Sequence, residues 1–420
     1  MSLEKPKFYE EKKEFVYTMA FLLLLLLVRL FFSYQNYTEF ISKPFYFTHA
    51  TVLNAYEKVK HGKRYTVLKL RADEGFTFYT TTHKKEDFSH TKVRIQIFPN
   101  SGIAFKDYLG TFYVKSRIKE RVEVPDTFKD LLLLKVSDQH EDASIASFYN
   151  AIFFATAIDK RLREKIALLG VSHLVALSGF HLTILWGLIY GLLLLLYRPV
   201  QQKKFPYRFA LIDVGAAAML LLGLYLWFVD FPPSLVRSYA MVFAGWILLC
   251  MGIELLSFTF LATIILALLV LFPSLLVSLG FWLSVSGVFY IFLLLQYTRN
   301  YNKWMITLLV IPVGIFLLMQ PVVHSIFGVT SAYQLLSPLL SLLFIVFYPL
   351  VMFLHLVDLG GIFDGMLLWL FSLPTISVEH ILPFWLGLAY IALSLAAIWN
   401  RKLFYALLGT ALGYAGYVFL

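Results

Sequence analysis

The sequence is poor in charge and in cysteine. Of its 420 residues, 15% are Asp, Glu, Lys or Arg, whereas soluble domains carry about 25%. The single cysteine, Cys250, excludes an intrachain disulfide. Neither a G-x-x-x-x-G-K-[ST] motif nor an H-x-H pair occurs, so we predict no nucleotide cofactor and no metal site. Hydrophobic residues make up 59%, in runs that exceed the roughly 20 residues of a membrane-spanning helix. This pattern predicts a polytopic α-helical membrane protein.

The apolar runs predict about 10–11 transmembrane helices. The first run, residues 15–32, follows a lysine-rich start and precedes no small-residue cleavage site, so we expect residues 1–33 to be a cytoplasmic N-terminus and a retained anchor. Residues 171–420 form the transmembrane domain of this prediction. Its candidate spans are 172–197, 208–229, 233–252, 255–272, 275–297, 303–320, 332–352, 356–373, 380–399 and 402–420.

Residues 34–125 have the pattern of a β-domain inserted after the first helix. In "RYTVLKLRA" Leu68 and Leu70 alternate with Lys69 and Arg71, and "KVRIQIF" alternates in the same way. Such period-two patterns are typical of half-buried strands. Turn signals such as "PNSG" separate the runs. Several short strands in this length predict a small β-barrel, resembling an OB-fold.

Residues 126–170 are predicted to be a linker and an amphipathic surface helix. In this segment Ile145, Phe148, Ile152 and Ala155 lie near one face, and a charge cluster follows at 159–165. A helix with one apolar face and charged flanks favours the membrane surface.

Charge in the short loops predicts the orientation. Basic loops at 198–208, 299–303 and 401–402 fall on the side of the N-terminus if the spans alternate. Because lysine and arginine mark cytoplasmic loops, the N-terminus is expected in the cytoplasm and the β-domain in the periplasm. The chain is then a multi-pass protein of the inner membrane, in contact with lipid.

Several polar residues lie inside or at the ends of the predicted spans. The segment "GVSHLVALSGFHLTILWG" contains His173, Ser178, Gly179 and His181. On one ideal helix the two histidines would lie about 80° apart. Polar groups at bilayer depth usually face protein or water. Two interpretations stay open, either neutral histidines hydrogen-bonded to a neighbouring helix or side chains that line an aqueous path.

Two further segments carry polar groups of the same kind. Ser234 and Arg237 lie in "PPSLVRSYAMVFAGW", where the arginine either extends to the membrane surface or faces an anion. Gly280 and Ser284 lie in "SLGFWLSVSG" with Gly287, in a stripe of small residues that commonly lets helices pack closely.

Three motifs in the same order resemble the ComEC family of competence proteins. "GVSHLVALSGFHLTIL" is similar to the family signature G-x-x-H-L-[LV]-A-[IL]-S-G-[LF]-H. "PPSLVRSYAMVFAGWILL" resembles its following S-x-x-R-A helix, with Ser238 in place of the alanine. "LFPSLLVSLGFWLSVSGVFYI" is similar to its P-x-x-[LV]-x-x-x-G-F-x-L-S-[FV] span. The resemblance covers most of residues 15–350.

The resemblance implies a channel that carries single-stranded transforming DNA across the inner membrane. Longer family members end in a metallo-β-lactamase-like domain, which this chain lacks up to Leu420, so we expect a short form that is not an enzyme. The implied partners are single-stranded DNA, a periplasmic DNA receptor and a cytoplasmic motor or single-strand-binding protein, and assembly into a homo-oligomer is left open. The residues expected along the DNA path are His173, Ser178, Gly179, His181, Ser234, Arg237, Gly280 and Ser284.

The β-domain offers a second candidate DNA site. OB-type barrels bind single strands through a basic groove with stacking aromatics. The candidate residues are Arg64, Tyr65, Lys69, Arg71, Phe78, Lys84, Lys85 and Arg94. The alternative is that the aromatic rings fill the barrel and the cations contact anionic lipid.

Two rival functions are weighed against the channel. A secondary transporter or permease for another anionic substrate would predict paired broken helices in inverted repeats, and no such pairing is evident. An intramembrane serine protease would use Ser178, but Ala176 replaces the first glycine of the G-x-S-G motif and His181 follows closely on the same predicted helix.

Overall fold

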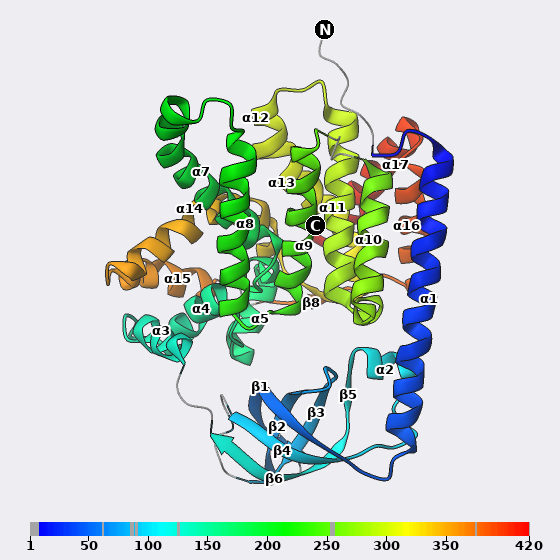
Figure 1. Cartoon of the computed structure of the whole chain (residues 1–420), viewed down its shortest axis with the longest axis vertical. Coiled ribbons are helices and arrows are strands. Elements are labelled where there is room, and N and C mark those ends of the chain that lie inside the picture. The colour runs from blue at the N-terminus through cyan, green and yellow to red at the C-terminus, as the bar shows by residue number, and fades with distance from the viewer. Residues whose placement is uncertain are drawn as a thin grey trace. The chain divides into compact units, whose positions relative to one another are not determined.

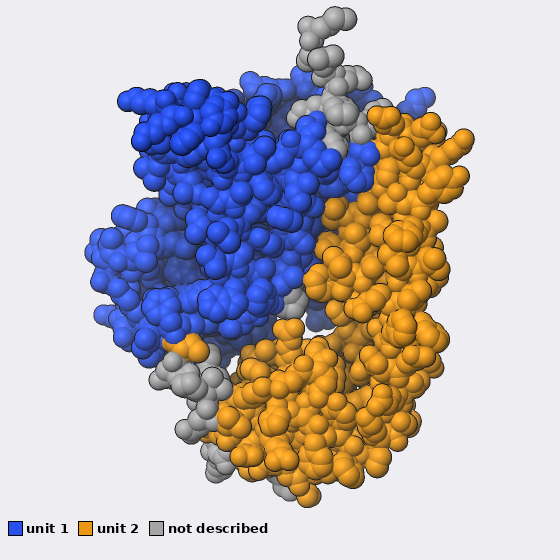
Figure 2. Space-filling view, in the orientation of Figure 1, with its two compact units in different colours: residues 1–8, 128–261, 282–420 blue, residues 9–127, 262–281 orange. Residues whose placement is uncertain are grey.

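The computed structural model describes residues 8–60, 63–84, 88, 91–123, 127–252, 257–373 and 376–419. The chain divides into two compact units (Figure 2). Unit 1 comprises residues 1–8, 128–261 and 282–420, and unit 2 comprises residues 9–127 and 262–281.

Unit 2 begins with one long helix, α1 (Lys12–Ser42), which forms the predicted anchor and continues beyond it. Its apolar middle is exposed, with Phe21, Leu24 and Phe31 each 59% accessible, as expected for side chains in contact with lipid. The helix does not end with the predicted anchor at Ser33 but extends nine residues further, and the bound of the anchor stays a prediction. Phe40 in that extension is only 4% exposed, so the last turns belong to the core of the β-domain.

The described strands of unit 2 form a six-stranded sheet in the order β5-β3-β2-β1-β4-β6 (Figure 1). All neighbouring strands are antiparallel except β3 and β5, which are parallel. The strands are β1 (Tyr46–Lys60), β2 (Lys63–Ala72), β3 (Thr77–Thr82), β4 (Thr91–Phe98), β5 (Thr111–Tyr113) and β6 (Lys115–Glu123).

The predicted alternation of the strands is confirmed. Leu68 and Leu70 on β2 are fully buried, as are Val93, Ile95 and Ile97 on β4. These side chains form one core with Phe78 and Phe112, and Phe40 of α1 packs on it. Tyr37 of α1 also donates a 2.7 Å hydrogen bond to the Ile103 carbonyl, which ties the helix to the domain at a second point.

Two short elements complete unit 2. The helix α2 (Phe105–Leu109) follows β4, and the 3₁₀ helix η1 (Pro273–Val277) connects two membrane helices. A Cβ placed on Gly110, at the end of α2, would lie 3.1 Å from a methyl group of Val277. The β-domain therefore packs against this connection as well as against α1.

Unit 1 is almost entirely helical. Two helices, α10 and α11, contain the bounds between the two units and therefore belong partly to each.

The described elements after β6 are α3 (Phe128–Ser137), α4 (Ala143–Phe154), α5 (Lys160–Leu168), α6 (Ser172–Val175), α7 (Gly179–Lys204), α8 (Ala210–Phe228), α9 (Pro233–Cys250), α10 (Phe258–Leu271), α11 (Leu279–Thr298), α12 (Lys303–Met305), η2 (Ile306–Val310), α13 (Ile311–His324), β7 (Val329–Thr330), η3 (Ala332–Leu336), α14 (Ser337–Leu356), η4 (Gly360–Phe363), α15 (Asp364–Ser372), β8 (Val378–Glu379), α16 (Phe384–Ala396) and α17 (Arg401–Phe419).

Within the described residues, six helices are long and apolar enough to cross a membrane. They are Lys12–Ser42, Gly179–Lys204, Ala210–Phe228, Leu279–Thr298, Lys303–His324 and Ala332–Leu356. Shorter apolar helices occupy most of the remaining predicted spans. The architecture is thus compatible with a polytopic helical membrane protein, while the number of 10–11 spans stays a prediction.

The single amphipathic surface helix expected in residues 126–170 is wrong. Three helices, α3, α4 and α5, occupy the segment. Helix α4 is buried on nearly all sides, with Ile145, Tyr149 and Ile152 fully inaccessible. It forms the core of unit 1 with residues of α7, α8 and α14. Its polar positions are few, and the charge cluster at 159–165 begins a separate helix, α5.

Candidate functional site

The signature segment does not form one continuous helix. Helix α6 ends at Val175, and residues 176–178 are extended before α7 begins at Gly179. Ala176 has ψ of 118° and Ser178 has φ of −138° with ψ of 179°, both outside the helical region. The predicted 80° separation of the two histidines is therefore wrong, because His173 and His181 lie on different helices.

The start of α9 holds this extended segment in place. Ser234 donates a 2.7 Å hydrogen bond to the carbonyl of Leu177. This carbonyl lies in the extended segment between α6 and α7, so the serine side chain takes the place of a backbone donor. Ser238, one turn later, lies against Gly179, where an added Cβ would come within 2.9 Å of the Ser238 hydroxyl oxygen. A glycine at position 179 thus lets α7 and α9 approach at their N-termini.

His181 is fully buried and has a defined tautomer. The backbone N–H of Ser178 donates to His181 Nδ1 at 3.3 Å, and the two residues form a capping box at the start of α7. Since Nδ1 accepts, Nε2 carries the proton of the neutral ring. This Nε2 is buried without a hydrogen-bond partner among the described residues. The ring lies edge-on against Phe344 and Tyr348 of α14.

His173 contacts the same helix from the other side of the break. Its Nε2 lies 3.1 Å from the hydroxyl oxygen of Ser341, and that hydroxyl donates to the Ser337 carbonyl at 2.8 Å. The Ser341 oxygen is thus the acceptor, and His173 donates through Nε2. The His173 side chain is exposed, in contrast to that of His181.

The N-terminal end of α14 was missed as part of this site. Ser337 donates to the carbonyl of Gly170 at 3.0 Å, and Gln334 donates to the Ala167 carbonyl at 3.3 Å. Gly170 has φ of +69°, a left-handed conformation that glycine adopts without strain. The polar run "SAYQLLSPLLS" before an apolar span was the available signal.

The other expected path residues are less closely associated with the signature. Arg237 is half-buried on α9, one turn after its start. Gly280 and Ser284 are exposed on α11. No heavy atom of another residue lies within 4 Å of a Cβ built on Gly280, so the close helix packing expected from the small-residue stripe is absent at this position among the described residues.

In unit 2, cationic and aromatic side chains share one face of the sheet. Lys69 of β2 pairs with Tyr79 of β3, and its ammonium lies 5.9 Å from the centre of that ring. Tyr79 pairs in turn with Tyr113 of β5, which is 52% exposed. Tyr65 and Arg71 are on the same face as Lys69 by the alternation of β2. Burial lowers the pKa of the Lys69 ammonium.

The remaining candidates of the β-domain have different surroundings. Phe78 is fully buried in the core and is not available to stack on a base, which corrects its assignment. Arg64 and Lys84 are exposed. Arg94 is exposed and lies 3.9 Å from Glu120. Lys85 lies outside the described residues.

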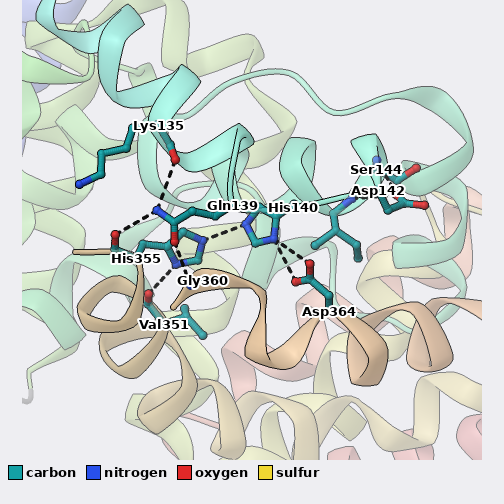
Figure 3. Close-up of polar contacts among 10 residues, drawn as sticks. Lys135, Gln139, His140, Asp142, Ser144, Val351, His355, Gly360 and Asp364 are labelled. Carbon is teal, nitrogen blue, oxygen red and sulfur yellow. Dashed lines mark hydrogen bonds and ion pairs between the residues drawn. The ribbon is translucent and has the colours of Figure 1, made fainter. Parts of the chain in front are cut away.

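A second buried polar cluster in unit 1 was not predicted. It joins His140, at the α3–α4 connection, to His355 of α14 and Asp364 of α15 (Figure 3). None of the three residues was among the predicted site residues, because they lie far apart in the sequence. Among the described residues, no group of three or more His, Cys, Asp or Glu side chains is arranged to hold a metal ion.

Comparison with known proteins assigns the helical part of the chain to a protein family. No curated protein and no solved structure matches the sequence. The family model described as competence protein matches residues 154–417, from the end of α4 into α17. That range exceeds half of the chain and includes the whole polar site at the start of α7. The chain therefore belongs to the competence protein family.

Proposed function

We propose that the chain is a ComEC-type channel, which carries single-stranded DNA across the inner membrane during natural transformation. The observation that carries the proposal is the family match over residues 154–417, since it spans the membrane helices together with the polar site. Membership in this family associates the chain with competence DNA uptake.

The chemistry of the polar site supports a path for a polyanion. Each nucleotide brings one negative charge, which hydrocarbon excludes, so the strand needs an aqueous path lined by protein. Such a lining must admit the strand without retaining it. The exposed imidazole of His173, hydrogen-bonded to Ser341, gives a polar surface, and the half-buried guanidinium of Arg237 supplies a positive charge.

His181 adds a donor that no described group uses. A buried N–H without an acceptor costs about 1–3 kcal/mol, so an acceptor on the strand would stabilise this group. We propose that rearrangement around the break at 176–178 exposes this Nε2 to the strand. The break itself favours such a rearrangement, because the backbone leaves the helical region at Ala176 and Ser178.

The β-domain is proposed to receive the strand before it enters the membrane. Lys69, Arg71, Tyr65, Tyr79 and Tyr113 combine cations with rings on one sheet face, which is the pattern of single-strand binding. We further propose that the sheet closes as an OB-like barrel. In support, β5 and β6 are separated by Val114 alone, and they pair with β3 and β4 at opposite edges of the strand order.

The contact between Ser178 and His181 does not favour the protease alternative. Ser178 Oγ lies 3.3 Å from His181 Nδ1, the distance of a catalytic serine–histidine pair. However, the same Nδ1 accepts from the Ser178 backbone, and the buried Nε2 has no described carboxylate to orient the ring. The arrangement is that of a helix cap.

The proposed location follows from the loop charges. The N-terminus is placed in the cytoplasm and the β-domain in the periplasm. Because the sequence has no P-loop motif, a cytoplasmic motor or single-strand-binding protein would supply the driving force, and a periplasmic receptor would deliver the DNA.

A substitution at His181 tests the channel. His181→Gln keeps an acceptor for the Ser178 N–H, because glutamine is a common third residue of a capping box. With its oxygen on the Ser178 N–H, the glutamine amide no longer presents a donor where Nε2 lies. We expect normal insertion and expression, DNA accumulation outside the inner membrane, and a loss of transformants of at least about 10-fold, because a hydrogen bond to a charged group contributes about 1.5–3 kcal/mol. Arg237→Ala should give the same pattern.

The matched control is His380→Gln in the same unit, where the ring contacts Tyr417 and lies outside the signature. Transformation and periplasmic DNA are measured separately in the natural host. Normal transformation by both His181→Gln and Arg237→Ala, at wild-type expression, would refute the proposed path.

A further inference from the structure

The cluster of His140, His355 and Asp364 is a linear chain of hydrogen bonds. His140 Nδ1 lies 3.0 and 2.9 Å from the two carboxylate oxygens of Asp364. On the opposite side of the ring, His140 Nε2 lies 2.9 Å from His355 Nε2. His355 Nδ1 lies 2.6 Å from the carbonyl oxygen of Val351. Figure 3 shows His140 between the other two side chains.

Counting donors along this chain gives its proton content. The Val351 carbonyl can only accept, so His355 Nδ1 carries a proton. The carboxylate of Asp364 lies near Nδ1 of His140 through both oxygens, as an ionised acceptor does, so this Nδ1 also carries a proton. The two Nε2 atoms at 2.9 Å need one proton between them, since two lone pairs would repel. All four contacts are hydrogen bonds at the same time only when the two rings hold three protons, one more than two neutral imidazoles.

The surroundings isolate this extra proton from water. The side chain of His140 is 0% exposed, that of Asp364 is 20% exposed, and His355 is buried. The ring of Tyr149 stacks on His140 with centroids 4.6 Å apart and planes at 10°, and it lies 4.5 Å from the His355 ring. The Tyr149 hydroxyl is buried without a described partner.

The other charged groups near the cluster are paired beside it. Lys135 lies 3.1 Å from Asp358, which follows α14. Gln139 donates to the His355 carbonyl at 3.1 Å and accepts from the Gly360 N–H at 2.8 Å. Within the part of the chain that the structure describes, Asp364 and Tyr149 contact the histidine pair, and Asp358, which is paired with Lys135, contacts the neighbouring Gln139. With Lys135 balanced by Asp358, the charge of Asp364 remains for the histidines.

The elements that meet here are far apart in sequence. His140 lies within the α3–α4 connection, and both α14 and α15 begin about 200 residues later. The close approach is tight at Gly360, where an added Cβ would lie 2.5 Å from Gln139 Oε1 and 2.7 Å from the His355 ring. The hydrogen-bonded chain is thus one of the polar links, beside those of Gln139 and Lys135, between the end of α3 with the α3–α4 connection and the helices α14 and α15.

We propose that His140 and His355 share one bound proton, balanced by Asp364, and that this proton holds the α3–α4 connection against α14 and α15 as a pH-sensitive latch. Loss of the proton leaves two Nε2 lone pairs facing each other and removes the bond between the histidines. The link then weakens as the pH rises. This inference is independent of the DNA path, because none of its residues belongs to the signature.

Nitrogen NMR of the full chain in detergent counts the protons directly. The protein is labelled with ¹⁵N-histidine, and the two rings are assigned with His140→Gln and His355→Gln. At about pH 6, below the ordinary histidine range, we expect three protonated ring nitrogens over the two residues. Two protonated nitrogens at that pH, one on each ring, would overturn the proposal.

Asp364→Asn provides the second measurement. The asparagine amide can donate to His140 Nδ1, so the network is complete with two neutral rings and needs no extra proton. The difference in melting temperature, wild type minus Asp364→Asn, should therefore decrease by roughly 2 °C or more as the pH is raised from about 6 to about 9.

The control is Asp107→Asn, whose carboxylate accepts from the Ala104 N–H at 3.3 Å and has no described histidine contact. Its melting temperature should differ from that of the wild type by a constant amount over the same range. A constant difference for Asp364→Asn as well would contradict the latch. If Asp364→Asn does not fold, the proton count of the wild type decides alone.

Discussion

Gly179 and Ser238 approach so closely that a Cβ on the glycine would meet the serine oxygen at 2.9 Å. The first residue of α7 and the second turn of α9 are therefore in backbone-to-side-chain contact. Ser234, one turn earlier on α9, binds the Leu177 carbonyl of the extended segment. The two helices fix the break in the signature together, and the smallest residue is required where they meet.

Gly179→Ala should destabilise this contact. The added methyl group overlaps Ser238, and overpacking of this kind costs about 1–3 kcal/mol. We expect a lower melting temperature in detergent and reduced transformation. Ser238→Ala in the same chain removes the oxygen and should restore part of both. Gly187→Ala on the same helix is the control, since no heavy atom lies within 4 Å of its added Cβ. Equal effects of the two alanines would exclude the steric explanation.

Tyr113→Leu should weaken binding of single-stranded DNA by the full chain. Tyr113 is 52% exposed beside Tyr79 on the cationic sheet face, and stacking of a base contributes about 1–3 kcal/mol. The dissociation constant should rise by about 5- to 150-fold, as measured by fluorescence anisotropy at low salt. Phe45→Leu, an aromatic residue of similar exposure before β1, is the control and should leave the constant unchanged. Unchanged binding by Tyr113→Leu would show that the rings do not stack on bases.

Binding of DNA should depend on pH through Lys69. Burial lowers the pKa of this ammonium below the ordinary lysine value of 10.5, so it loses its proton earlier than exposed lysines as the pH rises. Only the charged form attracts phosphate, and affinity should therefore decline with rising pH before 10.5 is reached. In Lys69→Met the affinity for DNA should be lower at neutral pH. The loss of affinity that deprotonation of Lys69 causes at higher pH should be absent in this variant. Parallel pH profiles of the wild type and Lys69→Met would contradict the assignment.

Phe40→Ala should destabilise the β-domain although the residue belongs to the anchor helix. Phe40 is 4% exposed and packs against Phe76, Tyr108 and Phe112, and truncation of a buried phenylalanine costs about 3–5 kcal/mol. Limited proteolysis should cut the β-strands faster in this variant. Phe31→Ala, on the same helix but 59% exposed, should behave as the wild type. Similar cleavage of both variants would indicate that the helix and the sheet are independent.

Much of the fold was predictable because local patterns report local burial. The alternation of Leu68 and Leu70 with Lys69 and Arg71 predicted which side of β2 is buried, since successive residues of a strand face opposite sides. The apolar runs predicted the long helices in the same way. The end of α1 was missed, because polar residues such as Gln35 and Asn36 continue a helix when its far end packs on another element.

The candidate site was predictable only in its residue types. The signature contains the polar residues, but Gly170, Leu177 and Gly179 take their positions from partners on α9, η3 and α14. The carbonyl groups of Gly170 and Leu177 accept hydrogen bonds from Ser337 and Ser234, which lie much later in the sequence. No periodicity within the signature could show that the helix breaks at 176–178.

The sequence by itself determined that the chain has apolar helices suited to a membrane, which segments are helices and which are strands, and the family of the helical part. Hydrophobicity and the order of motifs can be read directly along the chain, which is why these features were predictable. Only the tertiary structure decided that His181 is enclosed while His173 is exposed, and that His140 meets His355 and Asp364. Burial and hydrogen bonding depend on which distant helices pack together, and packing is a property of three-dimensional neighbours.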